Sequence, residues 1–369
     1  MKRLRDLWPQ LISFDNLWRA WRQARRGKSR SAGAVAFELN LERELLALQR
    51  ELNDGTYQPG AYRLFTLYER KPRLIAAAPF RDRVVHHAVM NVIEPPLDRT
   101  FIHDSYACRR GKGTHAAVDR YQRWAQRYPY VLKLDIRRYF PSIDHALLKA
   151  KLRRRIADPQ VLTLLDRIID GSPDAATDVP PFGKGGQGGF SEAVYFPGDD
   201  LLTPLERRRG IPIGNLTSQF FANLYLDDLD HWLKERRRVP AYLRYVDDLV
   251  LLADAKPELH DHHAALAEFL SRERLRLHPR KAQVSRTRDG LNLLGYVVYP
   301  QRRRLRNDNG LRFRRRLRRF ARAYAQGRIT LAAIDPSVQA WLGHARHADT
   351  FGLCQTIFNA VPFIRGADR

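Results

Sequence analysis

The chain has 369 residues, of which 44% are hydrophobic, so it can bury more than one core and general disorder is excluded. Lysine and arginine outnumber aspartate and glutamate by 65 to 40, a net charge of +25, which favours a polyanionic partner. No apolar run approaches the ~18 residues of a membrane-spanning helix, and charges interrupt the N-terminal apolar residues. We therefore expect a nucleic acid rather than a membrane as partner. Cys108 and Cys354 lack metal-ligand spacing, which agrees with a reducing, cytoplasmic location.

Helices and strands are expected to alternate along the chain, which predicts the α+β class. In the first half we expect helices within 1–55, two strands within 62–80, helices over 82–101 and 115–128, a strand ending at Asp135, and helices over 144–156 and on to about Asp170. In the second half we expect a helix over 218–235, a hairpin around Asp247, a helix over about 258–273, strands within 282–299 and a basic helical tail. Residues 171–209, rich in Gly, Pro and Asp, are interpreted as an insertion that contacts a partner or RNA.

Three aspartates are the strongest functional signal. Asp247 and Asp248 follow the apolar run AYLRY and precede LVLLA, a pattern typical of a β-hairpin with two carboxylates at its tip. Asp135 ends the strand-like run VLKL. Carboxylates held at fixed spacing bind Mg²⁺, and acids on two strands can hold two ions roughly 3.5–4 Å apart for phosphoryl transfer. The pattern predicts a metal-dependent nucleotidyl transferase, although Asp-Asp also occurs in ordinary turns.

Phe140 follows Asp135 by five residues, in a segment expected to leave the metal site. There its ring can lie beside the sugar of an incoming nucleotide and clash with a 2′-hydroxyl. An ordinary core aromatic is the alternative.

The segment from Gly210 to Gln219 is expected to be a flexible loop that leads into a helix. Thr217 or Ser218 can cap that helix, whose N-terminus attracts phosphate. The loop fits the wall against which a base pair stacks, with Ile213, Gly214 and Gln219 as the candidate contacts. Capping without any function is the alternative.

Several cations are candidates for contact with phosphate. Arg73 and Arg81, with Lys71, lie on or beside the expected strand pair, where they can clamp a triphosphate. Lys281, in LHPRKAQVS, can donate a proton to departing pyrophosphate. Each of these residues is otherwise a solvated surface residue.

The segment from Arg302 to Arg322 holds eleven arginines and one acid. Apolar residues recur in it close to helical spacing, at Leu311, Phe313, Leu317, Phe320 and Tyr324. This predicts a helix with one apolar stripe that lies along a phosphate backbone, contacted by Arg314, Arg315, Arg318 and Arg319. A solvated basic helix is the alternative.

Taken in order, these segments resemble the sequence blocks of a bacterial reverse transcriptase over roughly residues 60–300. The blocks are KPRLIAAAPFRDRVVHHAV, VLKLDIRRYFPSIDH, GIPIGNLTSQFFANLYLDDLDHWL, YLRYVDDLVLLA, RKAQVS and LNLLGYVVYP. The resemblance implies a right hand of fingers, palm and thumb. It assigns 1–120 to an N-terminal extension and fingers, 121–300 to the palm, with finger helices 144–170 and the insertion 171–209, and 301–369 to a basic helical thumb.

The resemblance also implies roles for single residues. Asp135, Asp247 and Asp248 would bind Mg²⁺, or Mn²⁺ in its place, with help from the backbone at Ile136. Phe140 would be the sugar gate and Lys281 the acid, while Arg73 and Arg81 would contact the triphosphate. The hairpin that grips the primer end would be Leu294-Gly295-Tyr296. The implied partners are template RNA, a primer or growing cDNA, and dNTPs.

The loop around Ile213 indicates a branch of this family. Many reverse transcriptases place Gln before the glycine and Pro after the serine, whereas this loop reads IGNLTSQ. That is similar to the reverse transcriptases of diversity-generating retroelements, which copy a template-repeat RNA with errors at adenines and work with a small basic accessory protein. The chain after Tyr296 is expected to be too short for a maturase or nuclease domain.

Two other functions stay open. A retron-like or phage-defence reverse transcriptase would use the same chemistry. A catalytically silent palm, retained as an RNA-binding scaffold, is the alternative from a different class. The presence of all three acids counts against the silent palm.

Overall fold

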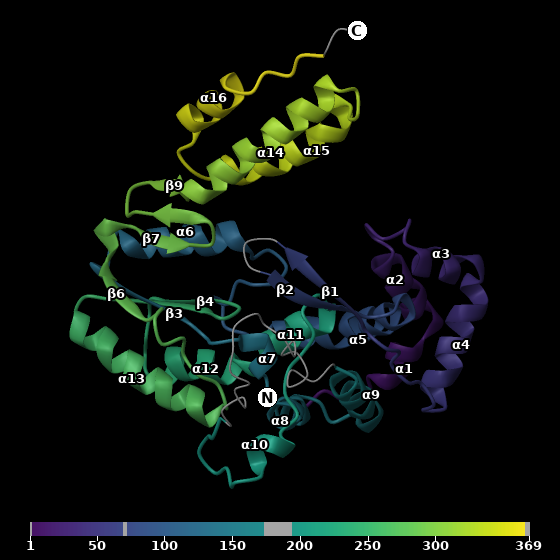
Figure 1. The fold of residues 1–369 in the computed structure, drawn as a ribbon. Helices are drawn as coiled ribbons and strands as arrows, with labels where there is room; N and C mark the ends of the chain where they lie inside the picture. The colour runs from purple at the N-terminus through teal and green to yellow at the C-terminus, as the bar shows by residue number, and fades with distance from the viewer. Residues whose placement is uncertain (1, 69–71, 173–193, 366–369) are drawn as a thin grey trace.

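The computed structural model describes residues 2–68, 72–172 and 194–365, and in them helices and strands alternate, as the α+β prediction requires (Figure 1). Lys71 and residues 173–193 of the expected insertion lie outside the described residues. Before the central sheet the elements are α1 (Trp8–Ile12), α2 (Phe14–Ala24), α3 (Ala32–Leu39), α4 (Leu41–Asn53), β1 (Arg63–Tyr68), β2 (Pro72–Ala77), α5 (Phe80–Asp98) and α6 (Thr114–Ala125).

The rest of the chain supplies the central sheet, its covering helices and a C-terminal helical part. The middle elements are β3 (Tyr130–Asp135), α7 (Tyr139–Ser142), α8 (His145–Arg155), α9 (Pro159–Asp170), α10 (Thr203–Glu206), α11 (Leu216–Tyr225), α12 (Asp227–His231), the π-helical turn η1 (Trp232–Arg236), β4 (Tyr242–Tyr245), β5 (Asp248–Ala253), α13 (Lys256–Arg272) and β6 (Gln283–Arg286). The last elements are the 3₁₀ turn η2 (Thr287–Asp289), β7 (Leu291–Leu293), β8 (Tyr296–Val298), β9 (Arg303–Leu305), α14 (Asn307–Ala325), α15 (Leu331–Ala345) and α16 (Phe351–Asn359).

The central sheet has the strand order β4-β5-β3-β6, and its neighbouring strands are antiparallel. Successive side chains of a strand point to opposite faces, so β5 contributes to two cores. Leu249 and Leu251 join the core that includes α11 and α13, whereas Val250 and Leu252 join the core shared with α6 and the C-terminal helices. Both faces are covered, which explains why β5 is a continuous apolar run in the sequence.

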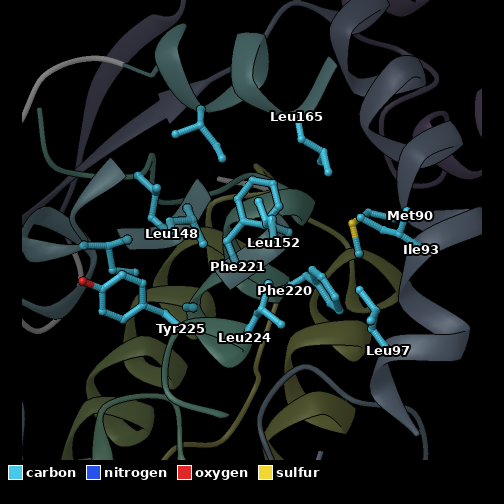
Figure 2. Packing of buried hydrophobic residues seen from close by; sticks show 14 of the residues in the cluster. Met90, Ile93, Leu97, Leu148, Leu152, Leu165, Phe220, Phe221, Leu224 and Tyr225 are labelled. Atoms are coloured by element: carbon cyan, nitrogen blue, oxygen red, sulfur yellow. The ribbon is translucent and has the colours of Figure 1, made fainter. Parts of the chain in front are cut away.

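Helix α11 lies at the centre of the first core. Figure 2 shows the side chains that meet there: Met90, Ile93 and Leu97 from α5, Leu148 and Leu152 from α8, Leu165 from α9, and Phe220, Phe221, Leu224 and Tyr225 from α11. Because α11 is buried by its neighbours on several sides, its start is fixed in space. The loop 210–215 that leads into it is therefore presented from a rigid base.

A second core ties the C-terminal helices to the rest of the chain, and Figure 1 shows these helices above the central sheet. Strands β7, β8 and β9 form a small antiparallel sheet, which lies between the central sheet and the C-terminal helices. Phe313 of α14 stacks on Trp341 of α15 with ring centroids 3.9 Å apart, and Leu317 is fully buried. Tyr296 of β8 belongs to the same core, so this core crosses from the sheet into the helices.

Two expected elements differ from the structure. The single helix expected over 218–235 is divided into α11, α12 and η1, with a break at Leu226. Directly after the break, Asp227 and Asp230 are buried instead of facing solvent: Asp227 pairs with the partly exposed Arg155, and Asp230 pairs with the buried Arg244. The start of the arginine-rich segment is a strand, β9, because it pairs with β8. Within the described residues, none of the helices has the length and apolarity of a membrane-spanning segment.

Candidate active site

Strands β3 and β5 bring two of the expected acids together. Their register pairs Asp135, the last residue of β3, with Asp248, the first residue of β5. Directly opposed residues of an antiparallel pair have Cβ atoms roughly 4.5–5.5 Å apart. Asp247 is tied to the same place, because the N–H of Ile136 donates to its carbonyl at 3.2 Å. The three acids predicted from the sequence therefore meet at one end of the central sheet.

The turn that carries Asp247 consists of two residues between β4 and β5. Val246 adopts a left-handed conformation with φ +57°, which is rare for a β-branched residue. Its carbonyl accepts a hydrogen bond from the buried Arg244 at 3.2 Å. Arg244 is not among the residues predicted from the sequence to be functional. The feature that could have indicated it is a charged residue inside the apolar run AYLRY.

Two lysines contact the acids. Lys281 Nζ lies 2.6 Å from Asp135 Oδ2, so the structure brings the expected acid catalyst to the triad. Lys133 Nζ lies 3.1 Å from Asp248 Oδ1 and was not predicted. The sequence contains a feature that could have identified Lys133: residues 133 and 135 are two apart in one strand, so their side chains lie on the same face of the sheet.

The charges at this site favour a cation. Partial burial raises the pKa of the Asp247 carboxyl to about 6, and the negative charges of Asp248 and Asp135 contribute to the rise. Three carboxylates are a donor set that suits Mg²⁺ or Mn²⁺. In the described part of the chain, no three His, Cys, Asp or Glu side chains are arranged to hold an ion as they stand. The donors fit the ion chemically, and Asp135 and Asp248 are each paired with a lysine through one carboxylate oxygen.

Loop 210–215 lies against β2. The N–H of Ala76 donates to the carbonyl of Ile213 at 3.3 Å. Gly214 has φ +115°, and a Cβ there would lie 3.1 Å from Ile75 Cγ2, so this position requires glycine. Ile213 is half-buried, whereas Gly214 and Gln219 are exposed. The hairpin β1–β2 and the loop thus form one surface next to α11.

The prediction that Thr217 or Ser218 caps the following helix is wrong. Helix α11 begins at Leu216, and both residues are buried inside its first turn. The N-cap is Asn215, a residue type preferred there, although its side chain makes no capping bond. Instead, Asn215 Nδ2 donates to the hydroxyl of Tyr62 at 3.1 Å.

Phe140 lies in α7, directly after the segment that carries Asp135. Its carbonyl accepts from the N–H of Ile211 at 3.1 Å, which connects the acids to loop 210–215. The ring is half-buried, packs partly against the first core and lies 5.8 Å from the ring of Tyr139 between centroids.

The two arginines expected at the triphosphate have different surroundings. Arg73 is exposed on β2. Arg81, at the start of α5, lies 2.6 Å from a carboxylate oxygen of Glu51 and 3.8 Å from one of Glu44. Its guanidinium also lies over the ring of Tyr57. Arg81 already joins α5 to α4, so a triphosphate would have to compete with Glu51 for it.

The expected primer hairpin is the turn between β7 and β8. Leu294 and Gly295 have φ +48° and φ +96°, as a two-residue hairpin turn requires. A Cβ at Gly295 would lie 3.2 Å from Nε2 of His344 in α15. Tyr296 is fully buried and its hydroxyl donates to the His344 carbonyl at 2.8 Å. Leu294 and Gly295 are half-buried at the turn, and Tyr296 anchors the hairpin to α15.

Helix α14 carries the expected nucleic-acid-binding arginines. Phe313 and Leu317 form its buried stripe, as predicted, whereas Leu311 is 55% exposed and lies outside that stripe. Arg314 is half-buried. The exposed members of the expected set are Arg315, Arg318 and Arg319.

This chain is similar to several known proteins. Residues 66–298 match the family model described as "Reverse transcriptase (RNA-dependent DNA polymerase)". Protein YkfC of Escherichia coli (strain K12) is 25% identical over 304 residues, which cover 71% of this chain and 72% of that protein. Group II intron-encoded protein LtrA of Lactococcus lactis subsp. cremoris is 22% identical over 195 residues, 52% of this chain but 28% of LtrA.

A solved structure of apo telomerase from Candida tropicalis, truncated from its C-terminal domain, is also similar. It has a TM-score of 0.48 and 12% identity, and the match covers 67% of this chain and 55% of that one. The residues that match the family model, 66–298, span the three acids, loop 210–215 and the turn at Leu294.

Proposed function

The chain belongs to the reverse transcriptase (RNA-dependent DNA polymerase) family, and from this premise we propose that it copies an RNA template into DNA by two-metal nucleotidyl transfer at Asp135, Asp247 and Asp248. Its fold is that of a right-hand polymerase, with mixed helices and sheet. The observation that carries the proposal is the meeting of the three acids at one end of the β3–β5 pair. Mg²⁺ or Mn²⁺, when bound, supplies positive charge for the attacking and leaving oxygens.

The remaining roles are proposed from the family match. Lys281, 2.6 Å from Asp135, would protonate the departing pyrophosphate, and Arg73 and Arg81 would hold the triphosphate. Phe140 would face the sugar. Loop residues Ile213, Gly214 and Gln219 would contact the nascent base pair, and Leu294 and Gly295 the primer end. Template RNA, a DNA primer and dNTPs are the proposed partners.

The direct test is primer extension by the purified chain. An RNA template with an annealed DNA primer, dNTPs and Mg²⁺ should give a DNA product of template length. Chelation of the metal should stop synthesis, and added Mn²⁺ or Mg²⁺ should restore it. A folded chain that binds the template–primer and extends it with neither metal would contradict the proposal.

Phe140→Ala should weaken discrimination against ribonucleotides. Removing the ring removes the steric wall at the 2′-position, and we expect the preference for dNTP over rNTP to fall by roughly 10–100-fold. Single-nucleotide incorporation rates for both substrates measure it. Tyr139→Phe, which changes the neighbouring buried aromatic, is the control and should keep the preference. Unchanged selectivity in Phe140→Ala would make this residue an ordinary core aromatic.

Replacing Arg315, Arg318 and Arg319 with glutamine should weaken RNA binding and its dependence on salt. Each lost phosphate contact should lower the slope of log K against log salt concentration by about 0.7–0.9, because fewer counterions are released. The measurement is a filter-binding titration at several salt concentrations, with folding checked by circular dichroism. Glutamine at the exposed Arg236 and Arg238 is the control, with an unchanged slope. The same slope in both variants would make α14 a solvated basic helix.

We further propose that copying is error-prone at template adenines and serves to diversify a target gene, with a small basic accessory protein as partner. The pattern around Ile213 supports this branch, because an apolar side chain stands where related enzymes carry a hydrogen-bonding Gln. A hydrogen bond contributes about 0.5–1.5 kcal/mol, which corresponds to a factor of roughly 2–13 in discrimination.

Ile213→Gln is therefore expected to raise fidelity by roughly 2–13-fold, chiefly opposite adenine, while synthesis continues. Sequencing of cDNA made on one adenine-rich RNA, with any accessory protein supplied, measures the errors. Ile213→Leu keeps apolar packing and should keep the wild-type error pattern. Equal adenine errors in wild type and Ile213→Gln would show that residue 213 does not set fidelity.

A retron-like, intron-type or phage-defence role is the competing function. The similarity to LtrA over half of this chain favours an intron-type palm. Wild-type fidelity separates the diversifying role from these competing roles: equally faithful copying of adenines and other bases would remove the diversifying role. The DNA beside the gene separates them independently, because diversification requires a pair of repeats that differ at template adenines.

A further inference from the structure

Arg244 is buried directly beside the turn that carries Asp247. It lies in β4, and its side chain and that of Asp230 in α12 are both 0% exposed. Arginine is almost never fully buried unless it is paired, so a buried arginine at this place requires an explanation. Its contacts supply one.

One edge of the guanidinium is bound to Asp230. Arg244 Nε donates to Asp230 Oδ1 at 2.8 Å and Nη2 donates to Oδ2 at 2.7 Å, a two-pronged pair. The hydroxyl of Tyr242 also donates to Asp230 Oδ1, at 2.7 Å. The pair neutralises the buried charge and fixes the plane of the guanidinium.

The other edge reaches the turn and helix α11. Arg244 Nη1 donates to the carbonyl of Val246 at 3.2 Å and to Asn223 Oδ1 at 3.2 Å. Nη2 also donates to the backbone carbonyl of Asn223 at 3.2 Å. Asn223 Nδ2 in turn donates to the carbonyl of Ala107 at 2.8 Å. One side chain thus joins the turn to a helix at the centre of the core.

One contact of Arg244 and one of Ile136 fix the backbone on the two sides of Asp247. The Val246 carbonyl belongs to the peptide that precedes Asp247, and Arg244 holds it while Val246 stays at φ +57°. The carbonyl of Asp247 belongs to the next peptide, and the N–H of Ile136 holds that one. Two fixed peptide planes set the direction in which the Asp247 side chain leaves the turn.

We propose that Arg244 is a positioning residue for metal binding: by holding the Val246 carbonyl, it directs the Asp247 carboxylate toward the place shared with Asp135. The inference rests on the proposed function of these acids as metal ligands. Lysine cannot replace arginine here, because its three donors radiate from one nitrogen and do not form a planar fork.

Arg109 provides a matched control. Its side chain is 8% exposed and its Nε donates to Asp98 Oδ1 at 2.6 Å. Its Nη1 donates to the carbonyls of Ile102 and Ser105 at 2.7 and 3.0 Å. Arg109 therefore makes the same kind of forked contacts as Arg244, without a contact to the turn.

The test compares Arg244→Lys with Arg109→Lys, each bound to template RNA and a DNA primer. Mn²⁺ binding is followed on a dideoxy-terminated primer, which cannot be extended, by the loss of the free-ion signal in electron paramagnetic resonance. The Mg²⁺ requirement is measured separately, by extension of a primer that keeps its 3′-hydroxyl. Arg244→Lys should weaken Mn²⁺ binding and raise the Mg²⁺ midpoint by about 10–100-fold, as loss of a group that orients a metal ligand does. RNA affinity should stay at the wild-type value. Arg109→Lys should change neither metal measurement.

Asn223→Ala provides a second variant if Arg244→Lys does not fold. It removes one acceptor of Nη1, so it should shift the same two measurements in the same direction by a smaller factor. Wild-type Mn²⁺ binding in the folded variants, or an equal loss in Arg109→Lys, would overturn the role of Arg244. If Asp247→Asn binds Mn²⁺ as wild type does, the assignment of the acids fails instead, and the inference with it.

Discussion

Replacing Asp247 with asparagine is expected to lower RNA-templated DNA synthesis by on the order of 10³-fold while the fold stays intact. Asparagine has nearly the shape of aspartate but lacks the negative charge that binds a cation. Metal ions supply several kcal/mol of charge stabilisation in phosphoryl transfer, and each ~1.4 kcal/mol is a factor of ten in rate. Single-turnover primer extension at saturating Mg²⁺ measures the loss.

The same substitution is expected to raise thermal stability at neutral pH in the absence of metal. The folded pKa of Asp247, about 6, lies above its ordinary value, so ionisation is less favourable in the folded than in the unfolded chain. The contribution of protonated Asp247 to the free energy of unfolding is fully present below the pKa of this group in the unfolded chain. It is lost as the pH rises through about 6, the pKa in the folded chain. Asparagine does not ionise. The difference in Tm, variant minus wild type, should be positive at neutral pH and vanish below about pH 4.

Asp254 provides the control for both measurements. It follows β5 at the opposite end from Asp248 and is exposed. Asp254→Asn should keep the wild-type rate and the wild-type Tm at neutral pH. Wild-type activity in a folded Asp247→Asn protein would remove Asp247 from the site.

The place of the acids could be predicted because it depends on local patterns. Asp135 ends an apolar run, and Asp247 lies between two such runs, so Asp135 was expected at the end of a strand and Asp247 in the turn of a hairpin. The buried stripe of α14 was predictable for the same reason, since Phe313 and Leu317 recur at helical spacing. Such signals need no knowledge of which strands are neighbours.

The surroundings of the acids could not be predicted, because they depend on contacts between distant segments. Lys133 meets Asp248 only because β3 pairs with β5 in one particular register. Arg81 is bound by Glu51 of α4, a pairing that no spacing in the sequence indicates. Strand β9 forms because its backbone pairs with the edge of β8, and this pairing overrides the helix predicted for the arginine-rich segment.

Lys281→Arg is expected to be nearly as inactive as Lys281→Ala, with losses of roughly 10²–10⁴-fold in the rate of nucleotide addition. Lys281 Nζ lies 2.6 Å from Asp135 Oδ2, and its side chain is 44% exposed, so it borders both the metal ligands and solvent. Arginine would keep the ion pair with Asp135 but is effectively always protonated in proteins. It can therefore offer charge to the departing pyrophosphate but cannot release a proton to it.

The comparison of the two variants separates proton donation from charge. If Lys281 protonates the pyrophosphate, both variants are slow in single-turnover extension, while dNTP affinity falls only in Lys281→Ala. If Lys281 acts through its charge alone, Lys281→Arg regains most of the wild-type rate, and the assignment as an acid is wrong. Lys256→Arg, at the start of α13 and away from the acids, is the control and should leave rate and affinity unchanged. The acid role is the expected result because Lys281 lies beside Asp135, where a bound metal ion would hold the departing pyrophosphate and a positioned lysine could donate a proton to it.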